Sequence, residues 1–256
     1  MNTKQIHKDP ASKFLNISLN YITMNTSFNK NGFHILNNIY THEEIETIIH
    51  LIESSEKSNT NFRKDKELFA IRAILKEIPK LKNHIFNKNL INIIEEIGNN
   101  TYFVIKSIYF DKPKTSNWVV PYHQDLTINL SEKIETDKFI NWTKKNEQIT
   151  VQPPTPILEN IFTIRIHLDN TTAENGAVKV IPKSHKKGII QLTDHEINKN
   201  KEYICDVPKG GVMLMKPLTL HASTRTTNNQ RRRVIHIEFS NIILDNGLKW
   251  NEYLAF

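Results

Sequence analysis

The chain has 256 residues, enough for one large domain, and a formal net charge of +7 from 34 Lys and Arg against 27 Asp and Glu. Hydrophobic residues make up 38% of it, which suffices for a core. No apolar run reaches the roughly 18 residues that a membrane-spanning helix needs. The single cysteine, Cys205, excludes an internal disulfide and is typical of a reducing compartment. Residues 1–26 form a polar extension without the apolar segment of a secretory signal, so we expect a cytoplasmic protein without membrane contact.

The positive charge is spread along the sequence rather than concentrated. The one tight basic run is Arg231, Arg232 and Arg233. A nucleic-acid-binding protein would be expected to gather basic residues on one face, together with aromatic side chains. We therefore attribute the charge mostly to solvated surface and predict no nucleic-acid partner. Attraction of an anionic substrate is the lesser alternative.

Two segments near the N-terminus have helical patterns. Thr41 and Glu44 have the spacing of a capping box, and isoleucines then recur at helical spacing on one face as far as Ile52. A second helical region is predicted over residues 78–97, with Asn89 as an internal cap and Gly98 closing it. We expect both regions to pack on the outside of a sheet.

From Tyr102 onward the sequence changes to short β-rich runs. The predicted strands cover residues 102–105, 161–166, 178–181, 212–215 and 234–237. Glycines supply turns between them, and little room is left for crossover helices. The pattern predicts a single domain over residues 27–256, mainly β with flanking helices, built on two antiparallel sheets of jelly-roll type.

Residues 126–160 interrupt this pattern with a long segment of little strand character. Loops of this length in a compact domain are commonly functional or disordered. Because the segment starts directly after the candidate metal ligands described next, we predict a lid over the substrate. The alternative is a surface insertion without a role.

Two histidines and an aspartate form the candidate metal site. His123 and Asp125 stand two residues apart at the end of a strand-like run, and His221 ends another apolar run far downstream. Two imidazoles and one carboxylate on one side of a metal leave its other side open, as a non-haem Fe(II) oxygenase requires. Arg232, on the next predicted strand, has the planar fork that anchors a carboxylate. Since side chains alternate along a strand, Arg232 would point away from Arg231 and Arg233.

Nearly the whole chain, from about Phe28 to Trp250, resembles the phytanoyl-CoA dioxygenase family of Fe(II)- and 2-oxoglutarate-dependent oxygenases. The matching segments are residues 31–36, 121–125, 165–169, 174–185, 221–223 and 232–239. Two positions depart from the family pattern. Lys183 replaces the glycine of a Pro-Gly-Ser-His turn, and Gly210-Gly211 replaces a Gly-Asp pair. Neither departure falls on a candidate ligand.

The resemblance implies a double-stranded β-helix, or cupin-like, core and a set of site residues. His123, Asp125 and His221 would bind Fe(II) and form the catalytic centre, where O2 is the oxidant. Arg232 would bind the distal carboxylate of 2-oxoglutarate, and Ser223 would hydrogen-bond the same co-substrate. Related halogenases have a small residue in place of the carboxylate, so the presence of Asp125 implies hydroxylation or desaturation.

Further candidates lie around this centre. Arg165 shares a strand face with Thr163 and His167, and an inward arginine needs an anion from 2-oxoglutarate or from an acidic substrate. Gln124 and Trp118 flank the metal segment and are candidate substrate residues. Lys106 and Lys112 are weaker candidates for facing the co-substrate. His167 could in principle replace a ligand but lacks the spacing.

The sequence thus favours a dioxygenase that hydroxylates an unactivated C–H bond of a small molecule and releases succinate and CO2. Arg165 and the basic balance favour a carboxylate- or phosphate-bearing substrate. A cupin-like metal enzyme that does not use 2-oxoglutarate is one alternative, and Arg232 argues against it. A non-catalytic binding protein is the other, and the intact set of ligands argues against that.

Overall fold

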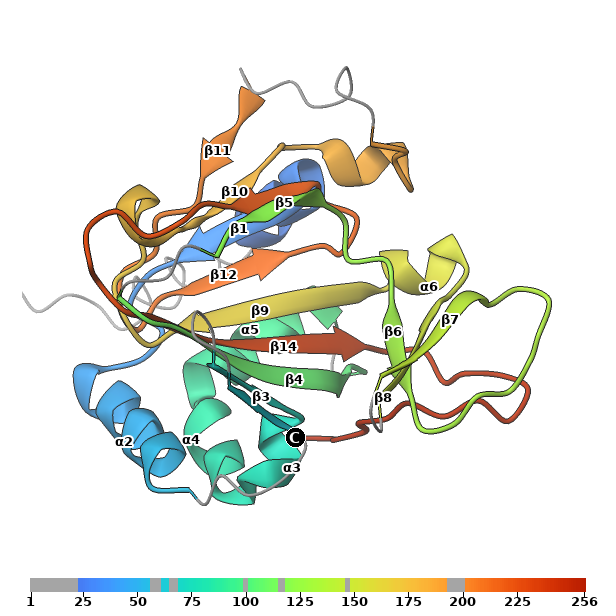
Figure 1. Ribbon diagram of the computed structural model, residues 1–256, viewed down its shortest axis with the longest axis horizontal. Coiled ribbons are helices and arrows are strands. Elements are labelled where there is room, and N and C mark those ends of the chain that lie inside the picture. The colour runs from blue at the N-terminus through green and yellow to red at the C-terminus, as the bar shows by residue number, and fades with distance from the viewer. Residues whose placement is uncertain are drawn as a thin grey trace, which may run out of the picture.

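The computed structural model describes residues 23–55, 61–64, 69–98, 101–114, 118–145, 148–192 and 201–256. Two antiparallel sheets enclose the centre of the domain, and a third lies beside them (Figure 1). The seven-stranded sheet has the order β1 (Phe33–Leu36), β12 (Val212–Met215), β9 (Ile161–His167), β14 (Arg232–Ser240), β4 (Phe103–Lys112), β3 (Phe69–Arg72) and β2 (Phe62–Lys64). The four-stranded sheet has the order β11 (Tyr203–Ile204), β10 (Val178–Val180), β13 (His221–Ser223) and β5 (Val120–His123). The predicted mainly β fold with a jelly-roll core is confirmed.

Side chains alternate along β14 between the hydrophobic core on one face of the seven-stranded sheet and the cavity on the other. Ile235, Ile237 and Phe239 are fully buried on the face that packs against the helices. Arg232, Val234, His236 and Glu238 alternate with them and point toward the four-stranded sheet, where they line a cavity. The strand therefore places its apolar residues in the core and its polar residues in the interior of the jelly roll.

Short helices cover the outer face of the seven-stranded sheet (Figure 1). They are α2 (His42–Glu53), α3 (Ile74–Glu77), η1 (Pro79–Leu81), α4 (Lys82–Ile85) and α5 (Lys88–Gly98). The capping box of α2 is present as predicted: the Glu44 backbone N–H donates to Thr41 Oγ1, and the Thr41 N–H donates to Glu44 Oε2. No helix among the described residues is long and apolar enough to cross a membrane.

The predicted helix over residues 78–97 is broken in the structure. Phe86 leaves the helical conformation and buries its ring against Phe239. α5 then begins behind Asn87, whose side chain accepts from the Leu90 N–H at 2.9 Å. The internal cap is therefore Asn87, whereas the predicted cap, Asn89, donates its amide to the Ile39 carbonyl.

The predicted polar extension lies mostly outside the described residues. Residues 23–31 are helical, and Met24 and Phe28, one helical turn apart, are both 1% exposed in the core. The packed part of the chain thus begins slightly before residue 27.

The segment at residues 126–160 contains a small antiparallel sheet, so the expectation of little strand character is wrong. Its strands are β6 (Ile128–Leu130), β8 (Gln148–Gln152) and β7 (Ile140–Lys145), followed by α6 (Thr155–Glu159). Leu130 and Val151 are buried in a separate core cluster with Trp250 from the C-terminal segment. Burial against residues so distant in the sequence stabilises strands whose own pattern is short.

Candidate active site

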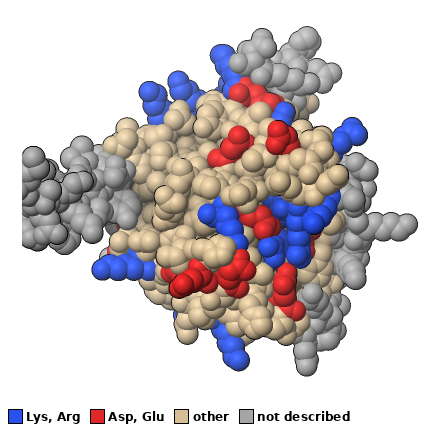
Figure 2. Space-filling view, turned by 90° about the vertical axis from the view of Figure 1, so that its left-hand side faces the viewer, with Lys and Arg blue, Asp and Glu red and all other residues tan. Residues whose placement is uncertain are grey.

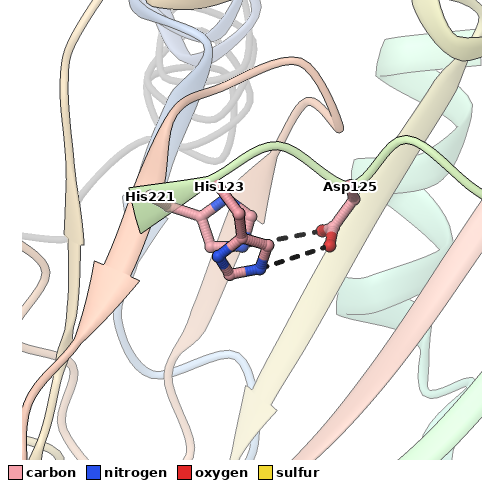
Figure 3. A group of neighbouring side chains, drawn as sticks. All are labelled: His123, Asp125 and His221. Atoms are coloured by element: carbon pink, nitrogen blue, oxygen red, sulfur yellow. Dashed lines mark ion pairs between the residues drawn. The ribbon is translucent and has the colours of Figure 1, made fainter. Parts of the chain in front are cut away.

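The two histidines are brought together by the pairing of β5 with β13, in which His123 lies opposite His221. Their ring centroids are 4.2 Å apart. Asp125 follows β5 in a loop whose backbone is fixed, since its N–H donates to the Pro217 carbonyl at 2.9 Å. The Nε2 atoms of His123 and His221 lie 3.8 and 3.7 Å from the two carboxylate oxygens of Asp125 (Figure 3). Potential ligand atoms of all three residues lie within 4.8 Å of one another.

Backbone hydrogen bonds orient both imidazole rings for metal binding. The Nδ1 atom of His123 lies 2.9 Å from the Pro121 carbonyl, and that of His221 lies 2.8 Å from the Thr219 carbonyl. A carbonyl can only accept, so each Nδ1 carries the proton and each Nε2 presents its lone pair toward Asp125. Among the described residues no other group of three His, Cys, Asp or Glu side chains could hold a metal ion.

The protonation states of the ligands also suit a cation. Burial lowers the pKa of His221 to about 4, so its imidazole is neutral at physiological pH. Burial of Asp125 opposes ionisation, but the nearby His221, His236, Lys106 and His123 outweigh it and lower the pKa of this carboxyl to about 2. A neutral imidazole and an ionised carboxylate are the forms that bind Fe(II).

The ligands open into a cavity of about 310 Å³ between the two main sheets. His123, Asp125 and His221 stand on one side of it, and Arg232, Ser223 and Arg165 also line it. All six predicted metal- and cofactor-binding residues therefore share one cavity, as does the predicted substrate residue Trp118. A volume of this size suits a small molecule.

Arg232 is a buried cation in this cavity. Its Nε and Nη1 atoms are buried and have no hydrogen-bond partner among the described residues. Burial, with the neighbouring Arg165 as a second cause, lowers the pKa of Arg232 to about 9, so the guanidinium stays protonated at neutral pH. A buried cation without a partner is unfavourable by itself, and an anion in the cavity would remove that penalty. A dicarboxylate such as 2-oxoglutarate therefore fits the residues present.

A chain of charged and polar groups crosses the floor of the cavity. Arg165 Nη1 lies 3.2 Å from His236 Nδ1, and His236 Nε2 lies 3.0 Å from Glu238 Oε1. The same Glu238 oxygen accepts from Lys106 Nζ at 2.8 Å. The Nε of Arg165 has no partner among the described residues. Lys106 thus lines the cavity but is neutralised by Glu238.

Sequence reasoning gave His236 and Glu238 no role, although a signal for them exists. Both follow Arg232 on β14 with the two-residue period of one strand face. Once Arg232 is assigned to the interior, this period places the other two beside it.

One candidate, Gln124, has a different position from the one expected. The sequence predicts Gln124 as a substrate residue, but its side chain does not line the cavity. Its amide donates to the carbonyls of Gly188 at 2.8 Å and Leu218 at 2.7 Å, and its Oε1 accepts from the Ile190 N–H. Gln124 lies between His123 and Asp125 in the sequence, but its side chain points away from theirs. Its hydrogen bonds connect the loops that carry Asp125, Gly188 and Leu218.

Lys112 and His167 are held by protein groups. Lys112 Nζ donates to the carbonyls of Trp118 and Thr224 at the edge of the cavity. His167 is buried behind the cavity, with Nδ1 2.7 Å from Thr171 Oγ1, and is not part of the metal-binding group.

Two arginines of the basic run are paired with carboxylates on the outside of the domain. Arg231 forms ion pairs with Asp111 and Glu53, and Arg233 with Asp169 and Glu53. On the face drawn in Figure 2, Lys and Arg side chains lie next to Asp and Glu side chains. This arrangement agrees with the interpretation of the net charge as solvated surface.

A jelly roll whose four-stranded sheet and the loop after β5 hold two histidines and an aspartate beside an open cavity defines a class of metal-binding proteins. The family described as Phytanoyl-CoA dioxygenase (PhyH) matches residues 28–234. The chain belongs to this family, and its double-stranded β-helix fold is the one that its solved structural neighbours have. A comparison with curated protein sequences gives no match.

Solved structures with the same fold include several oxygenases and related enzymes. HygX from Streptomyces hygroscopicus, with nickel and 2-oxoglutarate bound, is 14% identical, with a TM-score of 0.60 over 85% of this chain and 86% of that one. EctD from S. alaskensis, with 2-oxoglutarate and 5-hydroxyectoine, is 14% identical, with a TM-score of 0.65 over 85% and 75% of the two chains. SnoN, an alpha-ketoglutarate-dependent epimerase from nogalamycin biosynthesis, is 10% identical, with a TM-score of 0.62 over 87% and 81%.

Proposed function

We propose that the protein is an Fe(II)- and 2-oxoglutarate-dependent dioxygenase that hydroxylates a C–H bond of a small molecule. The observation that carries the proposal is that one cavity holds both an open group of two histidines and one carboxylate and a buried arginine whose Nε and Nη1 have no partner among the described residues. The first fits a metal that must bind further ligands, and the second fits a dianionic co-substrate. Family membership supports the proposal, and so do the metal and 2-oxoglutarate bound in HygX.

The metal- and co-substrate-binding residues of the cavity then have defined roles. His123, Asp125 and His221 hold Fe(II), while Arg232 and Ser223 bind the distal carboxylate of 2-oxoglutarate. When bound, the metal and co-substrate supply the oxidation: one oxygen atom of O2 enters succinate as CO2 leaves, and the other enters the substrate. The protein orients the reactants and excludes water.

The substrate side of the cavity carries Arg165 and Trp118. Arg165 still has an unpartnered Nε, which favours a substrate or co-substrate oxygen anion near it. We therefore favour a small molecule bearing a carboxylate or phosphate. The segment at residues 126–160, with its small sheet beside the main sheets (Figure 1), is proposed as the lid.

Anaerobic titration of the Fe(II)-loaded protein with 2-oxoglutarate tests this function. A weak visible metal-to-ligand charge-transfer band is expected, absent in His123→Ala and requiring more 2-oxoglutarate in Arg232→Met. If iron binds but no band forms, a cupin-like metal enzyme without 2-oxoglutarate replaces the proposal. If no iron binds, a non-catalytic binding protein does.

A further inference from the structure

A second cavity of about 170 Å³ adjoins the metal cavity. Lys106 and Ile108 of β4 line both, so the two spaces meet along this strand. The remaining walls come from β3, α3, the C-terminal segment and all three strands of the small sheet. The small sheet therefore forms one wall of a space next to the metal cavity.

The charge in this second cavity is predominantly positive. Arg72, Lys76 and Lys145 line it, against one carboxylate, Glu252. Both oxygens of Glu252 accept hydrogen bonds from Ser107, at 2.9 Å from its N–H and 2.5 Å from its hydroxyl. Burial raises the pKa of Glu252, and the hydrogen bonds from Ser107 oppose that rise. Lys76 and Lys145 alone therefore bring more positive charge to the lining than Glu252 balances.

Asn129, at the centre of β6, provides an independent sign of a ligand. The residue is 4% exposed and lines the second cavity. Its backbone carbonyl accepts from the Asn251 N–H, but its side-chain amide has no hydrogen bond to any described residue. A side-chain amide that lines a cavity and has no protein partner is available to bind a ligand there. Ile128 and Leu130 pack into the core from the other face of β6, so Asn129 faces the cavity that it lines, where a ligand oxygen can accept from its amide.

We propose that the second cavity binds an anionic group of the substrate, a carboxylate or a phosphate, while the carbon to be oxidised reaches the metal past Ile108. Lys76 and Lys145 supply the charge and Asn129 supplies a directed amide donor. That the bound anion belongs to the substrate rests on the proposed function. It assigns the small sheet, part of the proposed lid, a direct role in substrate recognition.

Calorimetric titration with inorganic phosphate, and separately with acetate, tests this site. The protein is first saturated anaerobically with Fe(II) and 2-oxoglutarate, so that Arg232 is already occupied. One of the two anions is expected to bind saturably, and the stronger identifies the preferred group. Lys76→Met, Lys145→Met and Asn129→Leu should each weaken binding about tenfold, as expected for loss of a hydrogen bond to a charged group.

Lys80→Met is the matched control, since Lys80 is an exposed lysine near Lys76 that does not line the cavity. Equal binding by this control and all three cavity variants would overturn the inference, as would the failure of both anions to bind. Lys76→Met and Lys145→Met change exposed side chains, so they remain informative if Asn129→Leu does not fold. Anion binding at this site without a charge-transfer band would refute the proposed function alone, whereas a band without anion binding would refute only this inference.

Discussion

Arg232 and Arg233 are adjacent on β14 and serve opposite faces of the seven-stranded sheet. Arg233 makes a two-pronged ion pair with Asp169 outside the cavity, with Nη2–Oδ1 and Nε–Oδ2 distances of 2.7 and 2.9 Å. Arg232 lies in the cavity, and its buried Nε and Nη1 have no partner among the described residues. Because side chains alternate along a strand, Arg233 forms a structural ion pair outside the cavity while Arg232 faces the cavity, where it can bind a ligand.

Replacing Arg232 with Met should weaken the binding of 2-oxoglutarate and stabilise the protein without co-substrate. We expect 2-oxoglutarate binding to weaken by about 10- to 100-fold, because a charge-assisted hydrogen bond is worth roughly 1.5–3 kcal/mol. The protein without co-substrate should become more stable by about 1–2 kcal/mol, since a buried charge without a partner is removed. Titration of the charge-transfer band and chemical denaturation measure the two effects.

Arg233→Met is the control for this pair. It should bind 2-oxoglutarate normally and lose about 1 kcal/mol or less of stability, because its ion pair is only partly buried. Equal loss of 2-oxoglutarate affinity in both variants would show that the assignment of the two faces is wrong.

The stability difference between Arg232→Met and the unaltered protein should depend on pH. The pKa of Arg232 is about 9 in the folded protein and 12.5 as its ordinary value. The folded state therefore binds this proton less tightly than the unfolded state, and the penalty is fully present below pH 9. As pH rises through 9, the penalty is relieved. The difference between the denaturation midpoints of the two proteins should be largest and constant at pH 7–8, and should begin to shrink as pH rises from 9 toward 10, because the penalty is lost progressively between the folded pKa of about 9 and the ordinary value of 12.5.

The sequence could predict much of the site because its spacing is local or follows strand alternation. His123 and Asp125 are two residues apart, and the inward position of Arg232 follows from its neighbours. What brings His221 to His123 is the pairing of β13 with β5, which no local pattern encodes. Only the resemblance to the family indicated that His221 and His123 bind the same metal.

Gln124 and Asn129 show where sequence reasoning stops. Gln124 flanks two ligands, yet the carbonyls that accept from it belong to residues far along the chain, so its direction could not be inferred. Asn129 lies on β6, a strand stabilised by packing on Trp250 and paired to β8. Short strands that depend on such distant contacts have weak patterns of their own.

Lys183 should be replaceable by glycine with a gain in stability. It occupies the position of a glycine in the family pattern and has a φ of 69° and ψ of 1°, in the left-handed region. A side chain in this conformation costs about 1–2 kcal/mol relative to glycine, partly offset by the greater freedom of glycine in the unfolded chain. Lys183→Gly should therefore raise the free energy of unfolding by roughly 0.5–1 kcal/mol. Lys183→Ala keeps the strain, so equal stabilities of the two variants in urea would contradict the explanation.

Cys205 should be unreactive in the folded protein. It is 1% exposed, and burial raises the pKa of its thiol to about 12. Only the thiolate attacks disulfide reagents, so labelling with Ellman's reagent should be negligible between pH 7 and 9 and complete after denaturation. Rapid labelling of the native protein at pH 8 would show that the strand pairing around β10 and β11 opens readily.

Gln124 should influence metal binding without touching the metal. Its side chain joins the loop that carries Asp125 to the carbonyls of Gly188 and Leu218 and to the Ile190 N–H. Gln124→Ala releases these contacts and loosens the spacing of the flanking ligands, and outer partners of metal ligands typically contribute 10- to 100-fold in affinity. We expect a drop of about tenfold in Mn(II) affinity by calorimetry, with the 2-oxoglutarate requirement unchanged once metal is saturating. Gln191→Ala, at an exposed position next to the same loop, should leave the affinity unaltered. Gln124→Glu should be worse than Gln124→Ala, because a carboxylate would face two carbonyl oxygens; the opposite order would assign the effect to charge near the metal instead of loop geometry.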